Sequence, residues 1–162
     1  MAPYGGREGG IDPEEVLFEM GPRDEEGIHN FIKGFEERLR AGDATITDGP
    51  GDGGVDLENV VTRSNGTQVR WKIQVKSTKT PVSPSDMRDF VGRKHDDVEQ
   101  GDAATHYVFY SIRGFSDEAR AFGERNDIDL WTASDIVEEL RERKIMDLMF
   151  YPDDDEIPLN RG

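Results

Sequence analysis

The stretch that decides the fold is VDLENVVTRSNGTQVRWKIQVK, residues 55–76. In its second half, residues 69–76, apolar and polar side chains alternate, as they do in a strand with one buried face. Residues 55–62 show a weaker alternation and predict the partner strand. The polar segment Ser64-Asn65-Gly66 lies between the two, so the stretch predicts a β-hairpin.

The length of the turn sets which residues face each other. A two-residue Asn65-Gly66 turn would set apolar side chains opposite polar ones along the whole ladder. A three-residue turn, with Gly66 in the left-handed conformation, shifts the pairing by one residue. Apolar side chains then lie opposite apolar ones, and polar side chains opposite polar ones. Burial of several apolar side chains, at about 1.5–3 kcal/mol each, selects this second register. The expected pairs are Val55 with Val75, Leu57 with Ile73 and Val61 with Val69 on the core face, and Glu58 with Lys72 and Asp56 with Gln74 on the other face.

Helices and further strands are expected on both sides of the hairpin. An apolar stripe at helical spacing predicts a helix over residues 24–41, and a strand over 44–47 follows it. The other expected elements are a short helical turn from Asp12 ended by Gly21-Pro22, a helix over 84–99 capped by Ser83, strands over 105–112 and 128–131, a helix capped by Ser116, and a last helix capped by Thr132 or Ser134.

The order of these elements, α-β-β-β-α-β-α-β-α, predicts an α/β domain with a central mixed β-sheet flanked by helices. We expect this domain to occupy residues 13–145. Residues 1–12 are expected to be disordered, and residues 146–162 to form a C-terminal segment with an acidic tail.

Three polar residues of the hairpin could carry chemistry. In the expected register, Asp56, Gln74 and Lys76 converge on one face at the Gly-rich end of the hairpin. A carboxylate, an amide oxygen and the backbone carbonyl of Val75 can ligate a hard cation such as Mg²⁺. A neighbouring lysine can hold a phosphate or polarise the attacking water. Taken alone, such a triplet is explained more simply as the solvent-exposed polar face of an antiparallel sheet.

The charge of the chain is strongly acidic but uneven. The net charge is −15, from 35 acidic and 20 basic residues, and such a protein should repel nucleic acid at low salt. The bases are mostly arginine, and this lysine-poor, acid-rich composition is typical of halophilic proteins, in which salt screens the repulsion; an ordinary acidic protein is the alternative. Residues 63–94 hold eight bases and two acids, a charge of +6. That asymmetry indicates an anionic partner, unless it is a chance fluctuation on a solvated face.

Several classes of protein and site are excluded by what the sequence lacks. Without cysteine, the chain has no disulfide, thiolate zinc site or cysteine nucleophile, which is consistent with a cytoplasmic location. No apolar run approaches the roughly 18 residues of a membrane helix, so no membrane association is expected. His29, His95 and His106 lack metal-ligand spacing and are expected to be structural or surface residues, while Trp71 and Trp131 are expected in the core.

Two motifs of this region resemble those of the Mrr-like restriction endonucleases, a family within the PD-(D/E)XK nuclease superfamily. The first is GDGGVD at residues 51–56, and the second is the QxK variant QVK at residues 74–76. The segments MRDFVG at residues 87–92, Phe115-Ser116 with Ala119, and DIDLW at residues 127–131 are similar too, and the resemblance covers about residues 24–144. It implies a restriction-endonuclease-like core and a metal-dependent DNA endonuclease that hydrolyses phosphodiester bonds in restriction, defence or repair.

The resemblance also implies a role for each polar residue. Asp56 would be the metal-ligating acid, Gln74 the second ligand and Lys76 the catalytic lysine, with Mg²⁺ or Mn²⁺ as the cofactor. An acid from the first helix often completes such a site, and Glu36 is assigned to it because it follows an aromatic residue, as the acid does in the relatives. Glu25 and Glu26 are alternatives for that acid. Asp52 is either a further ligand or a turn former.

The basic segment supplies the expected contacts with DNA, at Lys72, Ser77, Lys79, Arg88, Arg93 and Lys94. A strand-exit loop and a solvated helix face are the alternative explanations of these residues. The domain lacks room for an elaborate sequence-reading module, so a homodimer or a separate specificity or motor subunit would supply specificity. Two other hypotheses are open: a catalytically inactive nuclease-fold binding or interaction module, motivated by the neutral Gln74, and an acidic domain that assembles through residues 145–151.

Overall fold

The computed structural model describes residues 12–47, 55–101 and 105–145. The expected disordered N-terminus up to residue 11, Asp52 in the Gly-rich loop, and residues 146–162 lie outside the described residues. None of the helices in the described part is long and apolar enough to cross a membrane.

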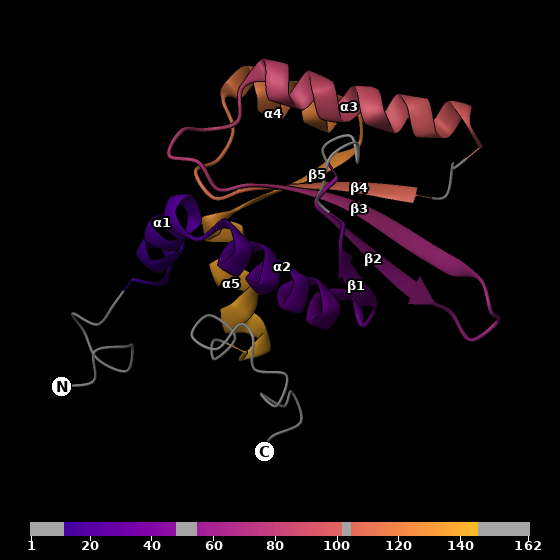
Figure 1. Ribbon diagram of the computed structural model, residues 1–162, viewed down its shortest axis with the longest axis horizontal. Helices are drawn as coiled ribbons and strands as arrows, with labels where there is room; N and C mark the ends of the chain where they lie inside the picture. Colours follow the sequence, from indigo (N-terminus) through magenta and orange to yellow (C-terminus); the bar gives the residue numbers. More distant parts are fainter. Residues whose placement is uncertain (1–11, 48–54, 102–104, 146–162) are drawn as a thin grey trace.

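The described residues form a five-stranded mixed sheet with the strands in sequence order (Figure 1). Its strands are β1 (Asp43–Ile46), β2 (Leu57–Thr62), β3 (Gln68–Lys76), β4 (Thr105–Ser111) and β5 (Ile128–Thr132). The first three strands are antiparallel, and β3, β4 and β5 run parallel to one another. The α/β class and the mixed sheet expected from the sequence are confirmed.

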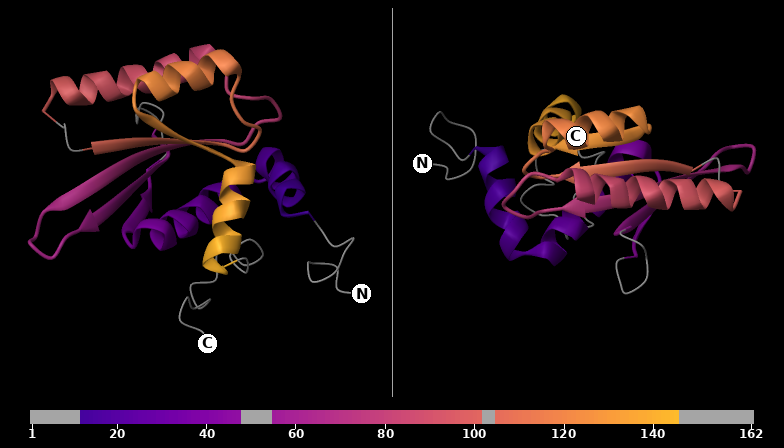
Figure 2. Two further views of the ribbon diagram at one scale, coloured as in Figure 1. Left: turned by 180° about the vertical axis from the view of Figure 1, so that it is seen from behind. Right: turned by 90° about the horizontal axis from the view of Figure 1, so that it is seen from above.

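Helices cover both faces of the sheet (Figures 1 and 2). One face carries α1 (Pro13–Arg23), α2 (Glu25–Arg40) and α5 (Ala133–Arg143), and the other carries α3 (Pro84–Glu99) and α4 (Asp117–Arg125). Each face has its own apolar core. Residues of α2, such as Phe31 and Phe35, pack on Leu57 and Ile73, while Phe90 of α3 packs on Phe109.

The register of the hairpin is the one expected from the sequence. Leu57 pairs with Ile73, Glu58 with Lys72 and Val61 with Val69. Gly66 has a φ of 88°, the left-handed conformation that the three-residue turn requires, and its N–H donates to the carbonyl of Arg63 at 2.9 Å. The alternation of apolar side chains and the turn length therefore agree on one pairing.

The expected pairing of Val55 with Val75 is wrong. Val55 packs with Val82 and Met87 in the core beneath α3, whereas Val75 belongs to the core beneath α2. The reason is that Asp56 and Leu57 both face Ile73, which inserts an extra residue into this strand and turns Val55 to the other face of the sheet.

The first helix is longer than expected, because α1 continues through Gly21 and Pro22 to Arg23. A proline in the last turn removes only one helical hydrogen bond, so it need not end the helix before it. Asp24 separates the two helices: its N–H donates to the carbonyl of Met20, and its side chain accepts from the N–H of Gly27 at 2.8 Å. This shared residue turns the chain from α1 into α2.

Candidate active site

Asp56 is bonded to the end of β3 by two hydrogen bonds. Its N–H donates to the carbonyl of Ile73 at 2.8 Å, so Asp56 and Leu57 both face Ile73 and form a β-bulge at the start of β2. Its carboxylate accepts from the N–H of Val75, also at 2.8 Å. The second bond turns the Asp56 carboxylate toward β3, beside the residues that flank Val75. The sequence motif is therefore assembled in space: the last residue of the Gly-rich segment meets the Gln-x-Lys end of the next strand.

Gln74 and Lys76 point to the α3 side of the sheet. In the parallel β3–β4 pair, Gln74 is in register with Phe109 and Lys76 with Ser111, and Phe109 packs in the core beneath α3. Both polar side chains are half-buried. The Lys76 Nζ lies 3.9 Å from Oδ1 of Asp86, in the first turn of α3. Strand β3 therefore presents its predicted site residues between the sheet and the start of α3.

The backbone carbonyl of Val75 faces the same way as that of Ile73, because residues two apart in a strand point their carbonyls in the same direction. The Ile73 carbonyl accepts from Asp56, so this direction is toward β2. The Asp56 carboxylate and the main chain of Val75 therefore lie together at the β2–β3 end, and Gln74 extends from the same end of β3 on the α3 side.

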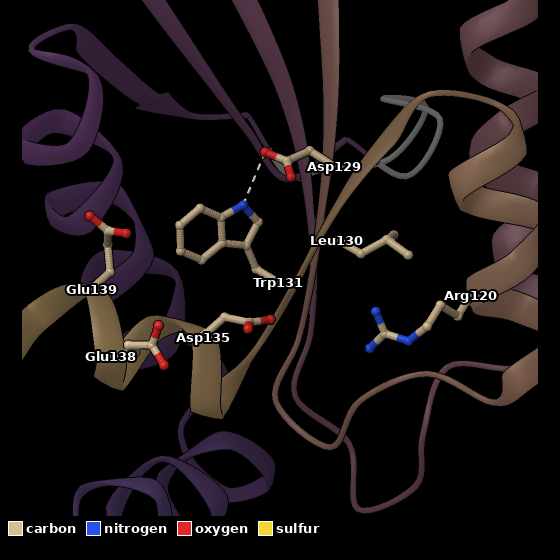
Figure 3. A pocket seen from close by; sticks show the side chains of 7 residues that line it. All are labelled: Arg120, Asp129, Leu130, Trp131, Asp135, Glu138 and Glu139. Atoms are coloured by element: carbon tan, nitrogen blue, oxygen red, sulfur yellow. Dashed lines mark hydrogen bonds between the residues drawn. The ribbon is translucent and has the colours of Figure 1, made fainter.

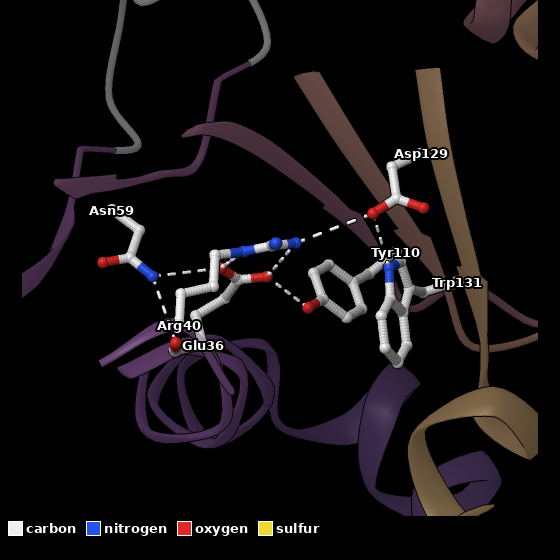
Figure 4. Close-up of polar contacts among 6 residues, drawn as sticks. All are labelled: Glu36, Arg40, Asn59, Tyr110, Asp129 and Trp131. Carbon is white, nitrogen blue, oxygen red and sulfur yellow. Dashed lines mark hydrogen bonds and ion pairs between the residues drawn. The ribbon is translucent and has the colours of Figure 1, made fainter. Parts of the chain in front are cut away.

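Glu36 lies on the other face of the sheet, and the structure does not bring it together with Asp56, Gln74 and Lys76. It is fully buried on α2, where it accepts hydrogen bonds from the hydroxyl of Tyr110 and from the side-chain amide of Asn59 (Figure 4). Arg40, one helical turn later, donates to it at 2.7 Å. Every one of these partners belongs to the α2 side, so the assignment of Glu36 to the metal site finds no support in the geometry.

The charge at Glu36 is balanced by a buried cation. Burial by itself would lower the pKa of Arg40, but the charge and hydrogen bond of Glu36, together with Tyr110 and Asp129, raise it above the usual value. Burial, followed by the negative charge of Glu36, raises the pKa of Tyr110 well above its usual value of 10.0. Arg40 therefore stays charged and Tyr110 stays protonated, which is the arrangement that satisfies Glu36.

The two alternatives for the helix acid also lie on α2, and therefore on the same side of the sheet as Glu36. Glu25 and Glu26 are exposed in the first turn of α2, on the same helix as Glu36. Among the described residues, no three His, Cys, Asp or Glu side chains are grouped as a metal site of such residues would need. A cation at Asp56 would therefore depend on amide and main-chain oxygens.

Lys72, expected to contact DNA, forms a largely buried ion pair instead. Its Nζ lies 2.9 Å from Asp97 of α3, and both side chains are about one-tenth exposed, at 12% and 11%. The Asp97 carboxylate also accepts from the hydroxyl of Tyr107 and lies 3.4 Å from Arg93. Burial opposes ionisation of Asp97, but the hydrogen bonds from Tyr107 and Lys72, with the charges of Lys72 and Arg93, lower its pKa below the usual value.

Other predicted DNA contacts divide between packing and exposure. The Lys94 ammonium donates to the carbonyl of Asn126 at 2.6 Å and joins the ends of α3 and α4. Ser77 is half-buried, while Lys79 and Arg88 are exposed, and neither of the two has an ion pair within the described residues. Much of the basic segment is thus neutralised internally, because the sequence shows its charges but not the acids of α3 that meet them.

A separate pocket lies along the edge strand β5, between α4 and α5 (Figure 3). It is lined by Arg120, Asp129, Leu130, Trp131, Asp135, Glu138 and Glu139. Four carboxylates against one guanidinium would repel a phosphodiester, and none of the lining residues comes from β2 or β3. The pocket is therefore not part of the site formed around Asp56.

Asp86 is the residue that sequence reasoning missed. Its position after Ser83 and Pro84 marked it only as a helix-start acid. The contact with Lys76 joins positions ten residues apart across a loop, and no local pattern shows it.

Solved structures with a similar fold include two restriction endonucleases. The chain aligns with the MspJI restriction endonuclease in complex with a 27-mer oligonucleotide at 16% identity and a TM-score of 0.62, covering 86% of this chain and 33% of that one. It aligns with the DNA modification-dependent restriction endonuclease AspBHI at 18% identity and a TM-score of 0.58, covering 83% and 36%. The chain thus spans about one third of the length of either protein, and these likenesses show a shared fold.

The family comparison uses sequence rather than shape. No curated protein matches the chain closely enough to count as a relative. The model of the Mrr catalytic family, described as restriction endonuclease, matches residues 26–140, which is well over half of the chain. This range includes the motif residues Asp56, Gln74 and Lys76. The chain therefore belongs to this restriction endonuclease family, and it has the fold of a DNA endonuclease catalytic domain.

Proposed function

We propose that this protein is a metal-dependent DNA endonuclease whose site consists of Asp56, Gln74, Lys76 and the main chain of Val75. The observation that carries the proposal is the hydrogen bond from the Val75 N–H to the Asp56 carboxylate. It holds an acid from one strand beside the Gln-x-Lys residues of the next. Pre-organised groups of this kind are what phosphodiester hydrolysis needs, because its charges develop at fixed positions.

The residues at this site fit a hard divalent cation. Mg²⁺ and Mn²⁺ prefer oxygen ligands, and Asp56, Gln74 and the Val75 carbonyl supply a carboxylate, an amide and a main-chain oxygen. When bound, the cation supplies acidity to water and neutralises charge on the phosphate. Gln74 carries no charge, so a site built on Asp56 holds its cation with fewer negative charges than a site with two carboxylates.

Lys76 supplies the positive charge of the site. Its side chain is about one-third exposed, so its ammonium group is accessible to a DNA phosphate from solution. An ammonium near the scissile phosphate stabilises the negative charge that grows as the leaving oxygen departs. The chain itself thus orients the cation through Asp56 and stabilises the phosphate through Lys76.

DNA as the substrate is supported by the family and by the exposed bases Lys79 and Arg88. Contacts from such residues to phosphates position a duplex without reading its sequence. The length covered by this chain in the MspJI and AspBHI structures leaves about two thirds of each outside the common fold. We propose that sequence or modification specificity comes from a homodimer or a separate specificity or motor subunit.

The acidic composition sets the conditions for the assay. With a net charge of −15, the protein repels DNA most strongly at low salt, and we propose that it works in the salt-rich cytoplasm of a halophile. Molar KCl reduces the screening length to about 3 Å, which removes most of that repulsion.

Plasmid nicking in molar KCl with Mg²⁺ or Mn²⁺ tests this function. The wild type should nick, and Asp56→Ala and Lys76→Ala should each lose at least about 100-fold in rate, as removal of one catalytic electrostatic group does. Asp96→Ala is the matched control, because Asp96 is an exposed acid on α3. Equal nicking by the wild type and by both site variants would mean contamination and would end the proposal.

A second function is favoured by the position of Glu36. With that acid on the far face and Gln74 neutral, the fold could serve as a DNA-binding module without catalysis. In that case the wild type would bind duplex DNA without a divalent cation and would not nick it. Loss of that binding in Lys79→Glu and Arg88→Glu variants, with the fold intact by circular dichroism, would favour this module over the nuclease.

A further inference from the structure

Helices α3 and α5 begin with the same cap pattern but use its acid differently. The sequences are Ser83-Pro84-Ser85-Asp86 and Thr132-Ala133-Ser134-Asp135. In α5 the Asp135 carboxylate accepts from the N–H of Thr132 at 2.9 Å and closes a capping box. In α3 the Ser83 hydroxyl accepts from the N–H of Asp86 at 3.2 Å, but the return bond from the carboxylate is not formed. The Asp86 carboxylate is instead directed to Lys76, at 3.9 Å.

This use of Asp86 matters because, among the described residues, Asp86 is the acid that pairs with Lys76. Of the acids considered for the site, Glu36 lies on the other face of the sheet, and Gln74 takes the place of a carboxylate on β3. Within the described residues, the ion pair of Lys76 is with Asp86. The ammonium thus lies between the polar end of the sheet and the first turn of α3.

The pair adds little to the stability of the fold. Both side chains are about one-third exposed, at 33% and 36%, and ion pairs of this exposure and length add little to stability. A closed capping box, as in α5, would have been the locally favoured use of the acid. The arrangement therefore favours the orientation of Lys76 over the capping of α3.

We propose that Asp86 is a positioning residue, which acts by holding the Lys76 ammonium at the end of β3 in the direction of the phosphate. This inference rests on the proposed nuclease function. It adds a residue of α3 to a site that is otherwise formed by the hairpin. Asp86 needs no contact with DNA or cation for this role, because it acts through the orientation of Lys76.

Steady-state nicking kinetics of Asp86→Asn and Asp86→Glu test the role. We expect Asp86→Asn to lower kcat about 10-fold with KM unchanged, because a displaced ammonium loses alignment with the transition state more than with the bound ground state. Asp86→Glu keeps the charge and should recover most of the rate. Asp89→Asn is the matched control, since it removes the same charge from an exposed position on the same helix, and it should keep the wild-type rate.

A second readout does not depend on activity. Mild reductive methylation followed by mass spectrometry measures how available each lysine is, with Lys79 as the internal reference. An ammonium held by a carboxylate is less available, so Asp86→Asn should increase labelling of Lys76 about threefold relative to Lys79, and Asp89→Asn should not. The same samples report by thermal unfolding whether α3 is still folded.

The outcomes separate the two proposals. Unchanged labelling of Lys76 in Asp86→Asn overturns the pair, and increased labelling with an unchanged kcat overturns its positioning role. An equal loss of rate in Asp89→Asn would mean that the effect comes from the negative charge of α3 in general. That result overturns the positioning role as well. A wild type without Asp56-dependent nicking, but with Asp86-dependent labelling, overturns the nuclease function and leaves the Asp86–Lys76 pair upheld.

Discussion

The Glu36 network on the α2 face and the end of β3 on the α3 face carry polar groups in opposite ways. On the α2 face, Glu36 has no exposed surface and is surrounded by Arg40, Asn59 and Tyr110 (Figure 4). On the α3 face, Gln74 and Lys76 are half-buried at the end of the strand. A buried network in which each member has partners specifies packing, whereas accessible groups in fixed positions can meet a ligand. The contrast indicates that the buried set supports the fold, while the polar groups at the end of β3 are in part accessible from solvent.

The largest effect is expected from Glu36→Ala, which breaks the closed network. The change leaves Arg40 without the anion that balances it and the hydroxyl of Tyr110 without its acceptor, at a cost of about 3–5 kcal/mol in the free energy of unfolding. Urea unfolding followed by circular dichroism measures it. Asp129→Ala serves as the control, because Asp129 is exposed and lies at the rim of the network. A loss below about 1 kcal/mol would contradict the structural role of Glu36.

At the end of β3, Asp56→Asn should lower the rate of nicking strongly and the stability only slightly. The neutral amide keeps the shape of the side chain but weakens the hold on a cation, so the rate of nicking should fall by about 100-fold or more. The hydrogen bond from Val75 is lost or weakened at a cost of only about 1 kcal/mol in stability. Nicking assays and urea unfolding on the same preparation check both numbers. An unfolded Asp56→Asn protein would mean that this face is structural as well.

Asp97 gives a pH-dependent test of the structural part of the α3 face. Its pKa is lowered in the folded protein, so its contribution is present above the unfolded value of about 3.9 and is lost as the pH falls through the folded value. Asp97→Asn should cost about 1–3 kcal/mol at pH 7. The difference from the wild type should shrink below about pH 4, which urea unfolding at several pH values measures. A constant difference across the series would disprove the linkage.

Tyr110→Phe should give the smallest change, about 1 kcal/mol near neutral pH, because it removes one buried hydrogen bond to Glu36. The contribution of Tyr110 to stability changes with pH in the opposite direction to that of Asp97. The raised pKa of Tyr110 gives stability that is present below about pH 10, the unfolded value, and is lost as the pH rises above it. Unfolding curves between pH 8 and about 11 should fall more steeply for the wild type than for Tyr110→Phe.

Much of the fold follows from local pattern. The alternation over residues 69–76 and a turn of three residues predict the hairpin register, because both are set by neighbours in the chain. The apolar stripe of α2 and the cap at Ser83 predict their helices for the same reason. Prediction failed at the ends of elements: an extra residue at Asp56 reverses the face of Val55, and a proline in the last turn of α1 does not end that helix.

The candidate site was predictable in part. The contact of Asp56 with the end of β3 follows once the register of the hairpin is known, because Asp56 directly precedes β2. Glu36 lies on a helix, and its partners Asn59 and Tyr110 are 23 and 74 residues away in the chain, which no local pattern reveals. The basic charges of residues 63–94 were visible, but their pairing with Asp86 and Asp97 depends on how α3 packs on the sheet.

The sequence by itself determined which residues alternate, where the chain turns, and that Asp56 comes to the end of the strand that carries Gln74 and Lys76. The tertiary structure decided which face of the sheet each helix covers. That choice placed Glu36 in a buried network and Asp86 beside Lys76. The physical reason is range: strand pairing and turn geometry act between near neighbours, whereas the partner of a buried charge is chosen by the packing of whole elements against each other.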